Sequence, residues 1–190
     1  MAQIIVNNVQ KVFKTPGKDV IALKDINLEI KQGEFVCLLG PSGCGKSTLL
    51  NAVAGFALPS AGEISVEGRK ITGPGPDRGM VFQEYALFPW MTIAQNIAFG
   101  LEVQKKSKAE IDLTVNQLLD LLHLNDFRDR FPKDLSGGMR QRVAIARVLA
   151  LDSPIMLMDE PFGALDALTR RNLQDELLRI WEKLGKTILF

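Results

Sequence analysis

The chain has 190 residues, of which 46% are hydrophobic and 24% charged, and its net charge is +1. This composition is typical of a globular protein and excludes a disordered chain. The near-zero charge argues against nucleic acid or an anionic membrane as the main partner. No apolar run approaches the length of a membrane span, and the N-terminus lacks the pattern of a signal peptide. If the protein works at a membrane, we therefore expect another chain to hold it there.

The two cysteines, Cys37 and Cys44, do not have the spacing of a metal site. Cys37 belongs to an apolar strand-like run and Cys44 to a glycine-rich loop, so we expect no structural disulfide. Reduced thiols are typical of a cytoplasmic protein.

The first part of the chain predicts short strands, over residues 4–6, 9–13, 20–23 and 26–30. A fifth apolar run, residues 34–39, leads into a glycine-rich stretch, and a helix-like run follows it. The stretch reads Gly40-Pro41-Ser42-Gly43-Cys44-Gly45-Lys46-Ser47-Thr48. A strand, a glycine loop and a helix in this order are the context of a phosphate-binding loop.

Each part of this loop has a chemical use. The glycines allow the backbone N–H groups to curl around an anion, and the helix that begins near Lys46 adds unpaired N–H donors. Lys46 would reach the β- and γ-phosphates of a nucleotide, and the Ser47 hydroxyl would coordinate Mg²⁺. The loop therefore predicts a bound nucleoside triphosphate.

The remaining elements follow in chain order. We expect strands at residues 63–68 and 79–82, the second ending at Gln83. Thr92 is expected to cap a helix that starts at Ile93. Further elements are an amphipathic helix at 109–122, a helix at 139–149, a strand at 155–158, a helix at 167–184 and a strand from 186.

The run Ile155-Met156-Leu157-Met158 is apolar throughout and is followed by Asp159 and Glu160. A strand that is apolar on both faces fits the centre of a parallel sheet, and ligands bind such sheets at the carboxyl ends of strands. Asp159 can hold Mg²⁺, and Glu160 can orient and deprotonate an attacking water. Combined with the phosphate loop, this pair predicts Mg-ATP hydrolysis.

A second helix start at Ser136-Gly137-Gly138 offers another anion site. One nucleotide does not need two such sites in one chain. One interpretation is a composite site, in which this motif caps the γ-phosphate of ATP held by a second copy in a two-fold dimer. The other is an ordinary capped helix with a glycine turn.

These motifs, with Gln83 and Ala164-Leu165-Asp166, occur in the order and spacing of the ATP-binding subunit of ABC transporters, which the chain resembles over nearly its whole length. The Leu-Ser-Gly-Gly-x-x-Gln signature at 135–141 is the most specific match. The resemblance implies an α/β fold: a RecA-like P-loop NTPase core with an antiparallel β subdomain and an inserted helical subdomain. The expected parts are residues 1–86, 87–150 and 151–190 of a single ABC ATPase domain.

The resemblance also implies roles for individual residues. Phe13 would stack on adenine, although packing in the core is an alternative for it. Gln83 would contact Mg²⁺ or the lytic water, and Asp166 would act across a head-to-tail dimer that closes on two ATP molecules. Ser136, Gly137, Gly138 and Gln141 would bind the nucleotide of the second subunit. Glu160, Lys46 and Gln83 would be the catalytic residues.

Within the family, residues 76–92 look most like importers for nitrate, sulfonates or taurine, mainly because of Pro89-Trp90. An exposed Trp90 there would suit docking to transmembrane permease subunits. The chain would then be a transport-coupled ATPase, peripheral at the cytoplasmic face of the membrane. The family places a histidine beyond the strand that starts at Lys186. The chain ends at Phe190, so we expect a C-terminally truncated cassette.

Three other functions fit the sequence less well. A soluble ABC ATPase acting on nucleic acid or ribosomes would need a second cassette or inserted arm and a basic surface. A non-catalytic ATP sensor would not need the Asp159-Glu160 pair. A phosphate-loop kinase would not need the signature motif.

Overall fold

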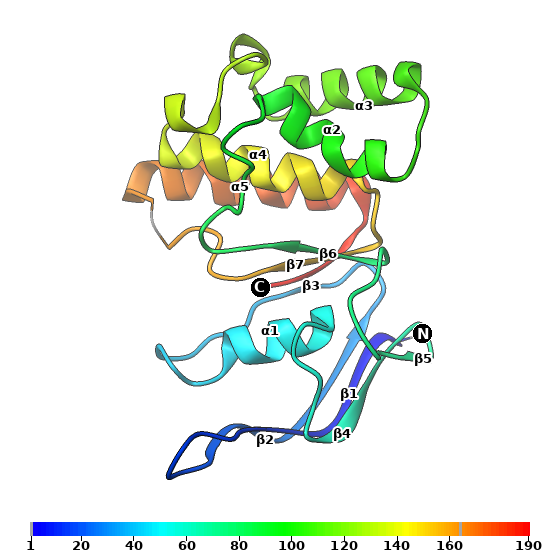
Figure 1. The fold of residues 1–190 in the computed structure, drawn as a ribbon, viewed down its shortest axis with the longest axis vertical. Helices are drawn as coiled ribbons and strands as arrows, with labels where there is room; N and C mark the ends of the chain where they lie inside the picture. The colour runs from blue at the N-terminus through cyan, green and yellow to red at the C-terminus, as the bar shows by residue number, and fades with distance from the viewer. Residues whose placement is uncertain (1, 164) are drawn as a thin grey trace.

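The computed structural model describes residues 2–163 and 165–190, so Met1 and Ala164, the first residue of the predicted Ala164-Leu165-Asp166 motif, lie outside the described residues. The structure is built in layers around two four-stranded sheets. Figure 1 shows the antiparallel sheet at the bottom, then α1, the parallel sheet, the pair α4 and α5, and finally α2 and α3.

The parallel sheet has the strand order β3-β8-β7-β6, and every neighbouring pair in it is parallel. Its strands are β3 (Phe35–Val36), β6 (Arg78–Val81), β7 (Ile155–Met158) and β8 (Thr187–Leu189). All four residues of β7 are buried. The prediction of a central strand covered on both faces is therefore confirmed, because helices enclose a parallel sheet on each side.

The antiparallel sheet has the order β2-β1-β4-β5. Its strands are β1 (Ala2–Phe13), β2 (Val20–Lys31), β4 (Ala61–Val66) and β5 (Arg69–Lys70). The prediction of two short strands in place of β1, and two in place of β2, was wrong. Asn8 and Asp25 adopt φ values of 47° and 51°, and β1 shifts register against β2 on both sides of Val9. Bulges of this kind let a strand bend without ending.

Five helices complete the described fold. They are α1 (Lys46–Ala54), α2 (Ile93–Val103), α3 (Lys108–Leu121), α4 (Gly137–Ala150) and α5 (Ala167–Leu184), with short 3₁₀ turns at Asn125–Phe127 and Pro132–Asp134. The predicted cap of α2 is confirmed, since Thr92 Oγ1 accepts a hydrogen bond from Gln95 N at 3.3 Å. α5 matches its prediction at both ends and stops at Gly185, whose φ of 60° suits a glycine.

Two hydrophobic cores lie on opposite faces of the parallel sheet. In β7, Met156 and Met158 belong to the core shared with α2, α3, α4 and α5, whereas Ile155 and Leu157 belong to the core shared with α1 and the antiparallel sheet. This alternation follows from the period of two along a strand. Among the described residues, no helix is both long and apolar enough to cross a membrane.

Candidate functional site

The predicted phosphate loop joins β3 to α1. Lys46 begins α1, and its Nζ donates hydrogen bonds to Gly40 O at 2.9 Å and Pro41 O at 3.0 Å. Gly45 adopts a φ of 102°, and a Cβ there would lie 2.6 Å from Ala22 O on β2. A side chain at this position is excluded for two reasons, because the backbone is left-handed and because the Cβ would clash with the carbonyl of Ala22. The antiparallel sheet thus sets the curvature of the loop.

The two predicted carboxylates follow β7 and contact two other predicted site residues, Ser47 and Gln83. Ser47 Oγ donates a hydrogen bond to Asp159 Oδ1 at 2.7 Å, and Gln83 Nε2 donates one to Glu160 Oε2 at 3.1 Å. These pairs are 112 and 77 residues apart in sequence. The parallel sheet brings them together, because β6 and β7 end side by side.

Glu160 has a φ of 45°, a left-handed conformation that is uncommon for a residue with a side chain. Gly163 N donates to Glu160 O at 3.0 Å and closes the tight turn after β7. Strained backbone of this type costs about 1–3 kcal/mol and gathers at functional sites. Lys46, Asp159 and Glu160 line a cavity of about 400 Å³ with Phe162 and Arg170.

The donor set at this place fits Mg²⁺. Ser47 Oγ and Asp159 Oδ1 are a hydroxyl and a carboxylate oxygen within hydrogen-bond distance, and the side-chain oxygen of Gln83 is a third candidate ligand. Mg²⁺ prefers oxygen and is usually held by one or two protein groups together with phosphates and water. No cluster of three or more His, Cys, Asp or Glu residues suited to a metal occurs in the described part of the chain.

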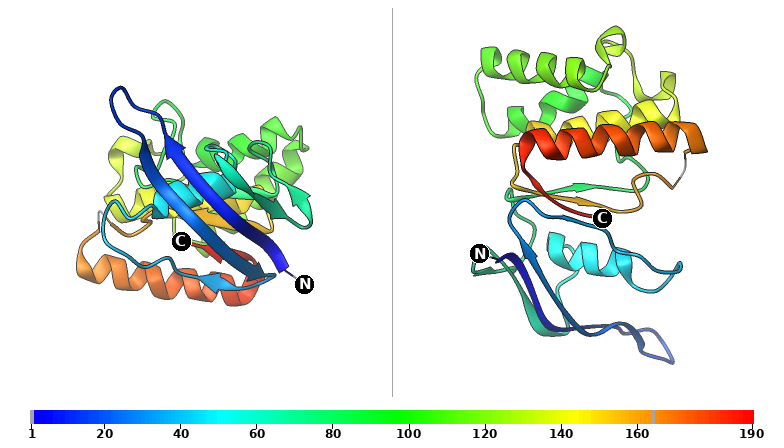
Figure 2. Two further views of the ribbon diagram at one scale, coloured as in Figure 1. Left: turned by 90° about the horizontal axis from the view of Figure 1, so that it is seen from below. Right: turned by 180° about the vertical axis from the view of Figure 1, so that it is seen from behind.

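Phe13 lies at the end of β1, opposite Val20 in the register of the β1–β2 hairpin. It is 41% exposed, and Lys11 Nζ lies 5.2 Å from the centre of its ring. The views in Figure 2 and Figure 1 agree in placing the hairpin tip and the phosphate loop at the same end of the molecule. The exposure argues against the core-packing alternative, so stacking on adenine stays as the prediction for Phe13.

The signature motif forms the start of α4. Ser136 is the N-cap, and its Oγ accepts a hydrogen bond from Met139 N at 3.3 Å. The two glycines lie against other segments: a Cβ on Gly137 would be 3.3 Å from Tyr85 Oη, and one on Gly138 would be 2.6 Å from Thr169 Cγ2. The two glycines therefore allow close packing against Tyr85 and Thr169, in addition to any role in ligand binding.

Gln141 was predicted to bind the nucleotide, and the structure places it differently. Its side chain is completely buried, and neither Oε1 nor Nε2 has a hydrogen-bond partner among the described residues. Gln141 therefore lies inside the protein, whereas Ser136 is exposed at the start of the same helix. None of the signature residues lines the cavity formed by Lys46, Asp159 and Glu160.

Sequence reasoning missed Arg147. Its guanidinium donates to Ala86 O at 2.6 Å and Tyr85 O at 3.4 Å, and lies 5.3 Å from the centre of the Phe88 ring. Burial lowers the pKa of this guanidinium from its ordinary value. A helical arginine next to an apolar stripe carries no sequence signal for contacts with a loop about sixty residues away.

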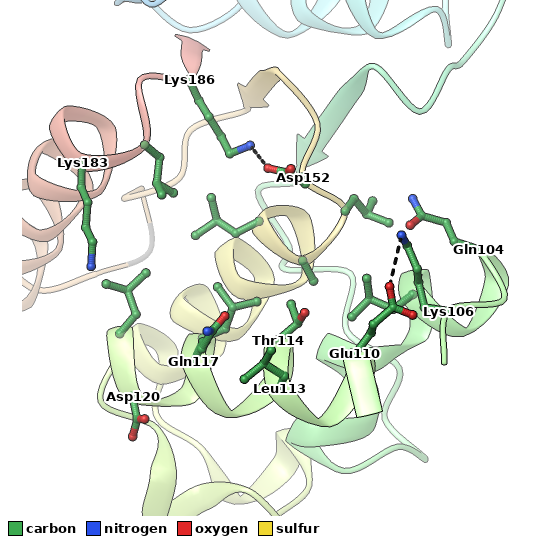
Figure 3. A pocket seen from close by; sticks show the side chains of 17 residues that line it. Gln104, Lys106, Glu110, Leu113, Thr114, Gln117, Asp120, Asp152, Lys183 and Lys186 are labelled. Carbon is green, nitrogen blue, oxygen red and sulfur yellow. Dashed lines mark hydrogen bonds and ion pairs between the residues drawn. The ribbon is translucent and has the colours of Figure 1, made fainter. Parts of the chain in front are cut away.

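Besides a smaller cavity between α2 and α3, two cavities lie outside the nucleotide site. One, of about 960 Å³, is bounded by α3 and the ends of α4 and α5 (Figure 3). The charged groups on its wall are partly paired, Lys186 with Asp152 at 2.7 Å and Lys106 with Glu110 at 3.8 Å. It contains none of the predicted site residues, so its size alone does not make it the functional centre.

The other is a groove of about 600 Å³ whose wall includes Phe56, Phe82, Phe88, Phe99 and Arg147. Trp90 stands next to Phe88, with ring centres 5.7 Å apart, and is 70% exposed. Trp90 is therefore exposed, which is the condition that docking through this residue requires. An aromatic groove with an exposed Trp beside it has the make-up of a protein-binding surface.

Comparison with known proteins agrees with this geometry. The family profile described as "ABC transporter" matches residues 23–163. The taurine import ATP-binding protein TauB of Roseobacter denitrificans is 51% identical over 190 residues, which is 100% of this chain and 71% of that protein. The nitrate import ATP-binding protein NrtD of Synechocystis sp. is 50% identical over 184 residues, 97% of this chain and 69% of that protein.

Among solved structures, the dimeric post-hydrolysis state of the ATP-binding cassette MJ0796 bound to ADP and Pi superposes with a TM-score of 0.87 at 36% identity. The match covers 98% of this chain and 86% of that one. The fold thus agrees with both kinds of comparison. The chain belongs to the ABC transporter family and is one of its ATP-binding, ATP-hydrolysing subunits.

Proposed function

We propose that this chain powers an importer for a small anion such as taurine, another sulfonate or nitrate. Support for import, and for this class of substrate, comes from relatives about half identical in sequence that are named for taurine and nitrate import. The Pro89-Trp90 pair agrees with the same subfamily. Those relatives are import subunits, so the alternative of a soluble ATPase acting on nucleic acid or ribosomes gains no support.

The observation that carries the proposed chemistry is the contact of Asp159 and Glu160, which follow β7, with Ser47 at the start of α1 and with Gln83 after β6. Ser47 and Asp159, with the Gln83 side chain, would hold Mg²⁺, which neutralises phosphate charge when bound. Glu160 accepts a proton from water as the water oxygen bonds to the γ-phosphorus. The bond from that phosphorus to the β–γ bridging oxygen breaks, and Lys46 offsets the charge that develops.

We propose a head-to-tail homodimer with two shared ATP sites. Phe13 stacks on the adenine, and residues 40–48 wrap the phosphates. The exposed start of α4, at Ser136 and Gly137, faces the γ-phosphate held by the other subunit, where a helix N-terminus suits an anion. Gly138 and the buried Gln141 support this helix start from within the subunit. Asp166, the N-cap of α5, acts across the same interface.

The aromatic groove is the proposed docking site for the transmembrane permease subunits. Its apolar wall and the neighbouring exposed Trp90 suit a partner helix better than a small polar ligand. Binding there would hold the chain at the cytoplasmic face of the membrane as a peripheral subunit. Of the three proposed parts of the cassette, residues 1–86 and 87–150 together form the docking groove, and residues 1–86 and 151–190 together form the nucleotide site.

Calorimetric titration with ATP and Mg²⁺ tests the nucleotide site, with Lys46→Ala and Glu160→Gln as paired variants. We expect saturable binding by the chain, loss of binding in Lys46→Ala, and retained binding in Glu160→Gln. Turnover in Glu160→Gln should fall by about 10²–10⁴-fold, the usual contribution of a general base. Unchanged turnover in Glu160→Gln, or undiminished binding in Lys46→Ala, would refute the assigned roles.

A further inference from the structure

A strained loop connects the proposed docking groove to the catalytic residues. The Gln83–Phe88 loop follows β6, and its Tyr85 and Ala86 have φ values of 61° and 48°. For residues with a side chain, this left-handed conformation costs about 1–3 kcal/mol each. Two consecutive strained residues persist only where neighbouring groups hold them in place.

Arg147 of α4 holds Tyr85 and Ala86 in this conformation. Its Nη1 donates to Ala86 O at 2.6 Å and its Nη2 to Tyr85 O at 3.4 Å, so one guanidinium spans the carbonyls of both strained residues. The guanidinium also lies 5.3 Å from the centre of the Phe88 ring. Only arginine combines a planar fork of donors with a flat face that can stack on an aromatic ring.

The other end of the same loop is Gln83, two residues before Tyr85. Gln83 Nε2 donates to Glu160 Oε2 at 3.1 Å, so the position of Gln83 sets the orientation of the proposed general base. The turn between Gln83 and Ala86 is short and internally bonded, with Tyr85 N donating to Phe82 O at 3.1 Å. Because this turn has no flexible residues to spare, a displacement of Tyr85 also displaces Gln83.

We propose that Arg147 is a positioning residue for ATP hydrolysis, which acts by clamping Tyr85 and Ala86 so that Gln83 stays aligned with Glu160. The proposal rests on the ATPase function assigned above. Arg147, Ala86 and Phe88 also line the aromatic groove. A partner segment seated in the groove would therefore lie against the clamp itself.

Hydrogen exchange tests the clamp without any need for catalysis. Arg147→Lys keeps the charge, but an ammonium is a point donor that cannot span both carbonyls and lie flat on Phe88. We expect amide exchange in residues 83–88 to accelerate about tenfold or more in this variant, since local opening becomes easier. Exchange in β7 and α5 should not change. Equal protection of residues 83–88 in both proteins would overturn the proposal.

A double-mutant cycle tests the route to catalysis. Arg147→Lys should lower kcat by about tenfold while the Kd for ATP changes little, because the phosphate loop is untouched. In a Gln83→Ala background the same substitution should have almost no further effect on kcat, since its target is gone. A merely structural role predicts equal effects in both backgrounds, and that result would refute the clamp.

Arg142→Lys is the matched control on the same helix. Arg142 Nε pairs with Glu176 Oε2 on α5 at 3.0 Å, and among the described residues its side chain forms no hydrogen bond with the loop. It should leave the exchange of residues 83–88 unchanged. If Arg147→Lys does not fold, Phe88→Leu, which removes the ring beneath the guanidinium, takes its place with the same expected results. Wild-type protein that fails to bind or hydrolyse ATP would count against the proposed function, whereas faster exchange would still support the clamp.

Discussion

The second signature glycine offers the sharpest test of whether that motif serves packing or phosphate binding. Gly138 is buried in the first turn of α4, and a Cβ there would lie 2.6 Å from Thr169 Cγ2, where ordinary contacts are 3.4–4 Å. Relieving such a clash in a packed interface costs about 1–3 kcal/mol. Replacing a helical glycine by alanine returns up to about 1 kcal/mol. We therefore expect Gly138→Ala to destabilise the protein by about 1 kcal/mol.

Thermal unfolding of four proteins measures this effect: wild type, Gly138→Ala, Thr169→Ser and the double variant. In a chain of this size, 1 kcal/mol shifts Tm by about 2–4 °C. Thr169→Ser removes only Cγ2 and keeps the hydroxyl, so the clash disappears. In that background Gly138→Ala should be neutral or slightly stabilising. Gly138→Ala is thus expected to lower Tm when Thr169 Cγ2 is present and not to lower it when that methyl group is absent.

Gly137→Ala is the internal control, because its Cβ would meet Tyr85 Oη at 3.3 Å and needs an adjustment of only a few tenths of an ångström. It should lower Tm less than Gly138→Ala does. If ATPase activity lost in Gly138→Ala returns with Thr169→Ser, the glycine acts through packing. A Tm that rises in both backgrounds would refute the steric reasoning, and activity that stays lost would assign Gly138 to the phosphate.

Three further predictions concern the nucleotide site and its neighbours. Phe13→Leu should weaken ATP binding severalfold more than Phe13→Tyr in a calorimetric titration, because only the aromatic ring can stack; equal losses would contradict stacking. Gly45→Ala should abolish ATP binding, since its Cβ would lie 2.6 Å from Ala22 O; normal affinity would show that the loop tolerates a side chain. The bond from Thr169 N holds the pKa of Asp166 below its ordinary 3.8, so this carboxylate contributes stability above that pH and loses the contribution as pH falls through its folded pKa. The difference in Tm between wild type and Asp166→Asn should therefore become smaller on acidification. A difference that does not depend on pH would show that the charge of Asp166 does not contribute to stability.

The elements that carry chemistry were predictable because local chemistry specifies them. Asp166 N-caps α5 and Gly185 ends it, as the cap residues and the apolar period predict. Both ends of β7 were predicted correctly, since a short run that is apolar on both faces fits the centre of a covered parallel sheet. The rule that ligands gather at the carboxyl ends of parallel strands predicted where Asp159 and Glu160 lie, but it did not predict their hydrogen bonds with Ser47 and Gln83.

The features that sequence reasoning missed depend on contacts between distant segments. The polar residues Asn8 and Asp25 indicated strand ends, but pairing with the neighbouring strand carries β1 and β2 through them with a local bulge. The predicted helix range 139–149 began two residues late, whereas the predicted helix start at Ser136-Gly137-Gly138 agrees with α4. Close packing against Thr169 and Tyr85 favours glycine there over helix propensity, and the sequence did not indicate those contacts. The burial of Gln141 follows from the same packing, and nothing in its own neighbourhood in the sequence indicates it.

The strand order β3-β8-β7-β6 has a consequence for synthesis on the ribosome. β3 and β6 emerge within the first half of the chain, yet they are not neighbours: β7 and β8 lie between them and are made last. Until Ile155–Leu189 leaves the exit tunnel, β3 and β6 of the nascent chain have no parallel neighbour, and the face of α1 that packs on the parallel sheet stays uncovered. Helices α2, α3 and α4 must likewise wait for the other face of β7. The cassette therefore closes in one late step, and an arrested nascent chain released before residue 155 is expected to require chaperones to remain soluble.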